Sequence, residues 1–398
     1  MSNILRHPLS WPNRLPSEGI ERVVEILNTG RMYRYNYETP DSNVALMEKE
    51  LACYIGSKYA IGVNSCAKGL EIILQSMGVR RDESVLMSAF TYTAVPSAIV
   101  NIGALPVLVG CTQDYGIDCD DLSKKAKEIK ARILVLSHMR GHISNMGEVT
   151  QICDKNGIDL VEDCAHSLGT KYNGKNMGLF GKAASFSMQS HKLINSGEGG
   201  IIITDDEEIY VKSVLYAGSQ DDFWMRHPFA NSLTNQLFAK YQEIIPNISS
   251  RMNNVTAEII RVQLPYLDEW KVQYNKNYKK VISIISKSKY ISLPSEQCTE
   301  RAQDTIQFNI KEFSQEEVDL FIKRLKIKGI DAKIFGLEGS PRFYKSWKYI
   351  KGIEKVTLAK TDEILKRAVD IRLPLWLNDD EVEYIGTSIF DTIQETKR

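Results

Sequence analysis

Short apolar runs alternate with helical stretches through the first half of the chain. The runs cover residues 60–63, 84–87, 106–109, 133–136 and 158–161. Apolar positions at helical spacing predict helices over 67–78, 93–102, 121–129 and 147–156. Strands that are apolar on both faces and separated by helices indicate a mainly parallel sheet that is covered on both sides. The pattern therefore predicts an α/β fold.

The rest of the chain extends this plan at both ends. Further helices are predicted over 17–28, 43–54 and 206–217, and a strand over 201–204. Residues 220–246 are polar and rich in aromatic side chains, without a clear period. A long helix over 254–287, broken near Pro265, leads into a strand at 305–310 and helices at 315–326 and 361–368. We expect a large domain over 1–264 and a smaller α+β domain over 265–398.

Composition excludes several classes of protein. The 398 residues include 50 basic and 50 acidic side chains. This balanced charge does not predict sequence-independent binding of nucleic acid. No apolar run approaches a membrane span, and the N-terminus lacks the apolar core of a signal peptide. The seven cysteines are odd in number and scattered, which favours reduced thiols in the cytoplasm over a disulfide framework or a zinc site.

Polar residues that follow the apolar runs carry most of the functional information, because ligands of such sheets bind beyond the carboxyl ends of the strands. The turn at 64–70 opens a helix and offers backbone N–H groups to a phosphate, or else caps that helix. Tyr92 follows the next run and is able to cover a planar ring, or else belongs to the core. Segments 137–142 and 162–167 follow two further runs and have turn or cap alternatives.

Lys192 lies in a polar stretch between apolar segments, just before the Gly-Glu-Gly-Gly turn at 197–200. This is a favourable place for a lysine that does covalent work as a Schiff-base amine, although an ordinary loop lysine fits the local pattern too. Together with a phosphate seat, a flat aromatic ring and the acid Asp163 at a strand end, the lysine matches what pyridoxal phosphate requires. The acid keeps the pyridine nitrogen protonated, and the lysine forms the imine.

The order and spacing of these motifs resemble the DegT/DnrJ/EryC1/StrS sugar aminotransferases. The segment 162–169 (Glu-Asp-Cys-Ala-His-Ser-Leu-Gly), the stretch at 178–181, and 185–200 with its Phe-Ser, lysine and Gly-Glu-Gly-Gly carry the resemblance. It covers the chain from about residue 15 to the C-terminus. It implies the aspartate-aminotransferase-like fold of pyridoxal phosphate enzymes (fold type I). It also implies a homodimer with shared active sites.

The resemblance implies roles for individual residues. Lys192 would hold the cofactor and shuttle protons, and Asp163 would pair with the pyridinium nitrogen. The other expected cofactor contacts are His166, Ser187, Cys66, Ala67, Lys68 and Tyr92, with Asn247 and Ser249 in the segment that reaches a neighbouring subunit. We expect Arg140, His138 and His191 to contact the substrate.

This chain departs from the family pattern at three places. Ser65-Cys66-Ala67 replaces the usual Ser-Gly-Thr, which removes the threonine hydroxyl from the phosphate seat. Ser249 stands where the family has an asparagine, with Asn247 two residues earlier. Arg140 stands where an aromatic residue or leucine is expected; its guanidinium could grip a carboxylate, or else form a structural ion pair.

The resemblance implies transamination from glutamate to a keto- or aldehyde-sugar that serves cell-surface polysaccharide or lipopolysaccharide synthesis. The acceptor would be a nucleotide-linked ketosugar or an 8-oxo-3-deoxy-octulosonate. Two alternatives are a sugar dehydratase of the same family, which has histidine at the lysine position, and a non-catalytic cofactor-binding regulator. No metal is expected, because Gly141 breaks the helix that the pair His138 and His142 would need.

Overall fold

A computed structural model describes residues 5–295 and 299–397. The large sheet has seven strands in the order β1-β9-β8-β5-β4-β2-β3. Their bounds are β1 (Tyr59–Val63), β2 (Ser84–Ser88), β3 (Leu105–Val109), β4 (Ile133–Ser137), β5 (Asp159–Asp163), β8 (Ala183–Ser187) and β9 (Gly200–Thr204). The ladders from β3 to β8 are parallel, and β9 runs antiparallel to both β8 and β1. The predicted α/β class with a mainly parallel sheet is confirmed.

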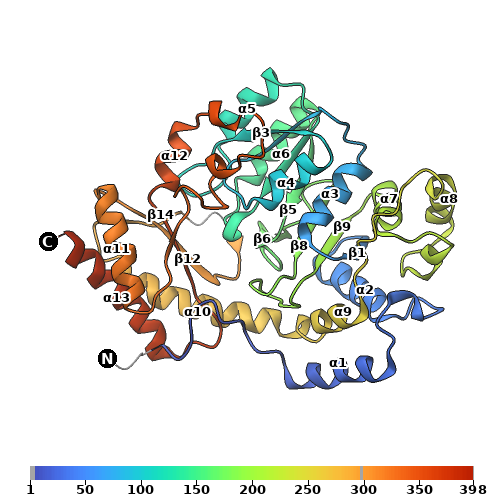
Figure 1. The fold of residues 1–398 in the computed structure, drawn as a ribbon, viewed down its shortest axis with the longest axis horizontal. Helices are drawn as coiled ribbons and strands as arrows, with labels where there is room; N and C mark the ends of the chain where they lie inside the picture. The colour runs from blue at the N-terminus through green and yellow to red at the C-terminus, as the bar shows by residue number, and fades with distance from the viewer. Residues whose placement is uncertain (1–4, 296–298, 398) are drawn as a thin grey trace.

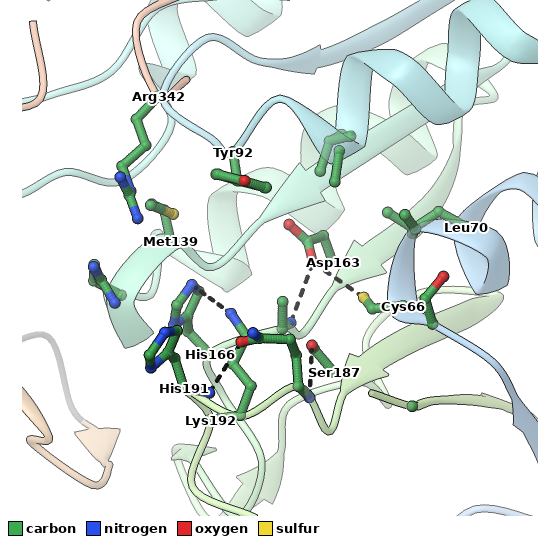
Figure 2. A pocket seen from close by; sticks show the side chains of 18 of the residues that line it. Cys66, Leu70, Tyr92, Met139, Asp163, His166, Ser187, His191, Lys192 and Arg342 are labelled. Atoms are coloured by element: carbon green, nitrogen blue, oxygen red, sulfur yellow. Dashed lines mark hydrogen bonds between the residues drawn. The ribbon is translucent and has the colours of Figure 1, made fainter. Parts of the chain in front are cut away.

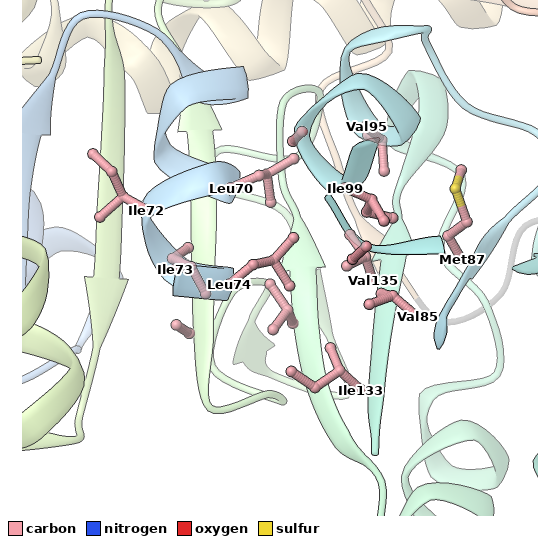
Figure 3. Close-up of a cluster of buried hydrophobic side chains, with 14 of the residues drawn as sticks. Leu70, Ile72, Ile73, Leu74, Val85, Met87, Val95, Ile99, Ile133 and Val135 are labelled. Carbon is pink, nitrogen blue, oxygen red and sulfur yellow. The ribbon is translucent and has the colours of Figure 1, made fainter. Parts of the chain in front are cut away.

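Helices cover both faces of this sheet (Figure 1). They are α2 (Asn43–Ile55), α3 (Cys66–Ser76), α4 (Ala94–Asn101), α5 (Cys119–Glu128), α6 (Met146–Asn156), α7 (Glu207–Ala217), α8 (Ser232–Tyr241) and α9 (Asn254–Arg261), while α1 (Ser17–Thr29) packs on α9. Alternate residues of one strand pack on opposite sides: Val85 and Met87 face α3 and α4, whereas Leu86 belongs to the cluster with α2 and α6. Figure 3 shows the first of these clusters, with side chains of α3, α4, β2 and β4 interdigitating.

The C-terminal part builds a second, four-stranded sheet in the order β10-β12-β14-β13. Its strands are β10 (Ile291–Ser292), β12 (Thr305–Ile310), β13 (Lys333–Ile334) and β14 (Ala368–Arg372). It packs with α10 (Leu267–Ile285), α11 (Gln315–Ile327) and α13 (Asp379–Lys397), while α12 (Ala359–Leu365) joins the large-sheet core. A small three-stranded sheet contains β6 (Lys171–Tyr172), β7 (Lys175–Asn176) and β11 (Thr299–Glu300).

Packing joins the two parts of the molecule in both directions. Leu5 and Leu9, from the N-terminus, lie in the C-terminal hydrophobic cluster. In the opposite sense, Phe343, Tyr344 and Trp347 pack into the core beside the large sheet. The predicted domain limits, 1–264 and 265–398, stay a prediction.

Some elements differ from the sequence prediction. The long helix at 254–287 is two helices, α9 and α10, with a 3-10 turn (Leu264–Tyr266) that contains Pro265 between them, as the expected break requires. Residues 220–246 contain α8, which was not predicted. Residues 183–187 form the strand β8, so Ser187 ends a strand and does not belong to the lysine loop.

Six of the seven cysteines lie within the described residues. Cys53, Cys66, Cys111, Cys119, Cys153 and Cys164 have free thiols. Cys298 and the first four residues, where no signal core was expected, lie outside the described residues. Within residues 5–295 and 299–397, every helix is too short or too polar to span a lipid bilayer.

Candidate active site

A cavity of about 360 Å³ lies beyond the carboxyl ends of β4, β5 and β8 (Figure 2). Its volume falls within the range of small-molecule and cofactor sites. The structure brings most of the residues predicted from the sequence to this cavity. Those lining it are Cys66, Ala67, Tyr92, Arg140, Asp163, His166, Ser187, His191 and Lys192.

Lys192 lies in the loop between β8 and β9, where its backbone N–H donates to the Gln189 carbonyl at 2.8 Å. Its amine lies 3.0 Å from Nε2 of His166. Burial, and next the charge of Arg140, lowers the pKa of Lys192 to about 8, although the nearby Asp163 acts in the opposite direction. A far larger fraction of this amine is therefore neutral and nucleophilic near pH 7 than of a solvent-exposed lysine.

Asp163 is the last residue of β5, and its carboxylate is held from several sides. Oδ2 accepts a hydrogen bond from Oγ of Ser137 at 2.7 Å, and Oδ1 accepts one from the Ala165 backbone N–H at 3.1 Å. The Cys66 thiol also points to Oδ1, at 3.7 Å. Ser137 ends the neighbouring strand β4 and pairs in register with Asp163, so the parallel ladder itself sets this contact.

His166 is a neutral imidazole in this site. Burial, followed by the charge of Lys192, lowers its pKa well below the usual value. Burial and the adjacent Arg372 also lower the pKa of His191, which is half-buried at the cavity wall. Neither ring therefore adds a positive charge near neutral pH, and both remain able to accept or donate a hydrogen bond.

An anion seat forms where α3 begins. The first amides of a helix have no intrahelical acceptor, and the N–H groups of Cys66 and Ala67 occupy that position beside Ser187. Gly200 makes the arrangement possible, because a Cβ atom there would lie 2.2 Å from the carbonyl carbon of Ser65. The final glycine of the Gly-Glu-Gly-Gly turn thus lets β9 approach the start of α3.

Lys68 does not reach the cavity. Its backbone N–H donates to Oγ of Ser65, the N-cap of α3, at 3.2 Å, and its amine pairs with Glu71 at 2.8 Å. Asn247 and Ser249 also lie outside the cavity, exposed, where Asn247 accepts the Ser249 backbone N–H at 2.7 Å. Both residues are expected to contact the cofactor of a neighbouring subunit. The structure describes a single chain, so this role stays a prediction.

His138 is buried away from the cavity, contrary to the expected substrate contact. Its Nε2 lies 3.1 Å from Oε2 of Glu162. Together with Cys164 these residues place potential metal ligands within 4.8 Å of one another. However, Glu162 already accepts backbone N–H groups from Gly178, Phe180 and Gly181 at 2.7–2.9 Å. Its acceptor positions are thus filled, and His138 and Glu162 brace the loop between β7 and β8.

Two lining arginines were not predicted from the sequence. Arg342 follows a turn at Ser340, and Arg372 ends β14, so both come from the C-terminal part of the chain. The guanidinium of Arg342 lies over the ring of Tyr92, with 5.5 Å from its central carbon to the ring centroid. The available signal was weak: Arg372 closes a short stretch at 368–372 in which three apolar residues surround one aspartate.

The residues present fit pyridoxal phosphate. A buried amine with a lowered pKa faces the cavity, a carboxylate stands at a strand end, and free amides with a serine hydroxyl form an anion seat. The seven-stranded sheet with this cavity at its carboxyl edge defines a pyridoxal-phosphate-dependent enzyme of the aspartate-aminotransferase-like fold.

The comparison with known sequences agrees. The chain belongs to the DegT/DnrJ/EryC1/StrS aminotransferase family, which it matches over residues 14–390. Enzymes of this family use pyridoxal phosphate to aminate sugars, and similar solved structures include a pyridoxal-phosphate form and a pyridoxamine-phosphate form.

Individual relatives are distant. The chain is 26% identical over 377 residues to the "Pleiotropic regulatory protein" of Geobacillus stearothermophilus, covering 93% of each chain. It is 31% identical over 166 residues to GDP-perosamine synthase of Vibrio cholerae, covering 42% of this chain and 45% of that one. Several other curated relatives are matched over 47–64% of their length.

A solved structure gives the fold comparison. Helicobacter pylori PseC, an aminotransferase involved in the biosynthesis of pseudoaminic acid, has a TM-score of 0.83 and 19% identity, covering 96% of this chain and 98% of that one. At this identity the likeness concerns the fold alone.

Proposed function

We propose that this protein transfers an amino group from glutamate to the ketone or aldehyde carbon of a sugar. The observation that carries the proposal is the buried Lys192 amine, with its pKa lowered to about 8, in one cavity with Asp163 and the anion seat at the start of α3. When bound, pyridoxal phosphate supplies an electron-accepting ring that stabilises negative charge on the substrate carbon.

Each residue of the chain then has a defined task. Lys192 would hold the cofactor covalently, and its neutral Nζ would take a proton from the carbon of the amino donor in one half-reaction and deliver a proton to the carbon of the acceptor in the other. The Asp163 carboxylate, fixed by Ser137, would hold the proton on the pyridine nitrogen. Ser187 and the first amides of α3 bind the phosphate.

Two further side chains shape the reaction space. Tyr92 would pack on the cofactor ring, and the neutral His166, whose Nε2 lies 3.0 Å from the lysine amine in this structure, would hydrogen-bond the ring hydroxyl. Because His166 is neutral, it adds no charge beside Lys192, whose pKa is lowered by burial and by Arg140.

Replacement of Lys192 by alanine tests the proposal. We expect amino transfer to fall by roughly 10⁴-fold, at the upper end of general acid–base contributions. Borohydride reduction should leave the cofactor attached to the Lys192 peptide in the wild-type protein and to no peptide in the variant, as read by mass spectrometry. Lys124→Ala, at an exposed position of α5, is the matched control and should retain both properties. Near-normal transfer by Lys192→Ala would refute the mechanism.

The homodimer with shared active sites is part of the proposal. Ile20, Val24 and Leu27 lie three and four residues apart on α1 and are all exposed, which leaves an apolar helix face for a second copy of the chain. Asn247 and Ser249 are exposed and do not line the cavity of their own chain, and in the dimer they would reach the cavity of the partner subunit. Sedimentation equilibrium should give twice the mass of the 45.1 kDa chain, and a monomer at micromolar concentration would exclude shared sites.

The product would be an amino sugar for cell-surface polysaccharide, including lipopolysaccharide, made in the cytoplasm. The acceptor candidates are a nucleotide-linked ketosugar and an 8-oxo-3-deoxy-octulosonate. A dehydratase would release a deoxy product and no 2-oxoglutarate. A non-catalytic regulator would show no turnover at all, so product analysis with glutamate separates the three.

A further inference from the structure

Three arginines from distant parts of the sequence line the cavity that contains Lys192. Arg140 lies in the short turn Met139–Gly141 after β4, Arg342 follows the turn at Ser340, and Arg372 ends β14. We call these three residues the guanidinium wall. In Figure 2, Arg342 lies at the opposite side of the cavity from Cys66 and Ser187, and so apart from the anion seat at the start of α3.

The wall has more positive charge than its protein neighbours neutralise. Arg140 donates from Nη2 to Oδ2 of Asp370 at 2.5 Å. Its Nε and Nη1, and Nε of Arg342, are buried without a hydrogen-bond partner among the described residues. Buried charged donors that lack an acceptor are costly. The unused donors of Arg140 therefore indicate a ligand that supplies acceptor oxygens.

Mutual repulsion within the wall supports the same conclusion. Burial, and next the charge of Arg140, lowers the pKa of both Arg342 and Arg372. Of the described residues that line the cavity, only Asp163 and Glu198 carry carboxylates, and Asp163 is already held by Ser137 and the Ala165 N–H. The nearby carboxylate of Asp370 raises the pKa of both arginines, and that of Asp304 raises the pKa of Arg372, which offsets part of the repulsion, but the pKa of both stays lowered. An anionic group between the arginines would relieve this repulsion.

The chemistry of the anion follows from the donors. Guanidinium groups present paired N–H donors that match the oxygens of a carboxylate or a phosphate, so the substrates that enter the cavity decide between the two. In a ping-pong reaction the amino donor and the amino acceptor enter the same cavity in turn. Glutamate carries a carboxylate remote from its amine, and a wall that binds this group offers the same contact to an acceptor that carries one.

We propose that the guanidinium wall is a carboxylate subsite and that the amino acceptor is a sugar acid, with its carboxylate remote from the carbonyl that reacts at Lys192. This inference deepens the proposed function and rests on it for the acceptor being a sugar. The wall orients both substrates, while a neutral sugar leaves the Arg140 donors unused; a diphosphate that binds the wall instead is the outcome that UDP-glucose tests.

Calorimetric binding to the cofactor-loaded protein tests the subsite without any amino transfer. The probes are D-gluconate, neutral D-glucose, the dicarboxylate glutarate and UDP-glucose. Arg342→Gln and Arg372→Gln each remove one half-buried guanidinium, and Arg80→Gln, at an exposed position away from the cavity, is the matched control. The use of two variants keeps the test valid if one of them fails to fold.

The expected result is that D-gluconate binds at least tenfold more tightly than D-glucose, and that each wall variant weakens this binding by about tenfold to a hundredfold. Arg80→Gln should bind as the wild type does. A parallel loss of glutarate binding supports a wall shared by glutamate and the sugar acid, and unchanged glutarate binding supports a wall for the acceptor alone.

Several outcomes would overturn the inference. These are equal binding of gluconate and glucose, gluconate binding that survives in both wall variants, loss of glutarate binding only, or a dependence on the wall seen for UDP-glucose instead of gluconate. Because no amino group moves in this assay, intact gluconate binding with absent transfer would count against the proposed function and not against the subsite.

Discussion

The two sides of the cavity are built in different ways. The cofactor side consists of residues at the ends of adjacent elements of one sheet layer: Asp163 ends β5, Ser187 ends β8, and Cys66 begins α3. The opposite side is the guanidinium wall, whose members Arg342 and Arg372 come from C-terminal segments some 150 residues or more beyond Lys192. A single cavity thus combines a locally determined half with a half set by long-range packing.

The two sides serve different purposes: the cofactor side holds the reacting groups, and the opposite side selects the substrate. The cofactor side depends on the register of parallel strands, as in the pairing of Ser137 with Asp163. The two C-terminal members of the wall, Arg342 and Arg372, depend on how the C-terminal part of the chain packs on the large-sheet core, where Phe343 and its neighbours are buried. Substitutions of these two arginines can therefore alter which carbonyl compound binds while the reacting groups stay in place.

The largest expected effect in this comparison concerns Asp163. Asp163→Asn keeps the acceptor for the Ser137 hydroxyl but removes the negative charge opposite the pyridine nitrogen. We expect kcat to fall by roughly a hundredfold, equivalent to about 3 kcal/mol, the upper range for a hydrogen bond to a charged group. Steady-state kinetics with glutamate measures it. If the variant instead lost affinity for the acceptor at unchanged kcat, Asp163 would act in acceptor binding and would not belong to the cofactor side.

A smaller, pH-dependent effect reports on the amine between the two sides. Because the pKa of Lys192 is lowered to about 8, the neutral amine increases with pH only up to that value. Covalent capture of pyridoxal phosphate by the cofactor-free protein should accelerate roughly tenfold per pH unit below pH 8 and then level off. Nα-acetyl-lysine, measured alongside, should keep accelerating toward pH 10. The same continued rise in the protein would mean that burial and Arg140 do not lower this pKa.

The smallest effect is expected from Glu162, which is adjacent to Asp163 but faces away from the cavity. Glu162→Gln weakens hydrogen bonds from the Gly178, Phe180 and Gly181 amides. The free energy of unfolding should fall by about 1–3 kcal/mol, measured from urea midpoints. The kcat of the folded variant should stay close to wild type. A loss of kcat as large as that of Asp163→Asn would show that Glu162 acts in the reaction.

The sequence predicted the fold where patterns are local. The apolar runs at 133–136 and 158–161 became β4 and β5 because strands buried on both faces leave a clear signal. The strand Ala183–Ser187 was missed, since its small and polar residues pack closely against α3 and do not form an apolar run. α8 was missed because its helix carries few buried side chains, Thr234 and Phe238 among them.

The same reasoning explains the site. Asp163 and Tyr92 follow apolar runs, so the strand-end rule placed them together. His138 follows such a run too, but its ring turns to the buried Glu162, which a sequence pattern does not reveal. Arg342 and Arg372 could not be placed, because their approach to Lys192 depends on the packing of the C-terminal segment onto the large sheet.

The most direct test of the account is a single half-reaction. The cofactor-loaded protein, mixed with glutamate and no acceptor, should release one 2-oxoglutarate per active site and then stop until a carbonyl sugar is added, whereupon the amino group should appear on that sugar. Lys192→Ala should release none at a comparable rate. Failure of the wild-type protein to release a stoichiometric amount of 2-oxoglutarate would contradict amino transfer at Lys192.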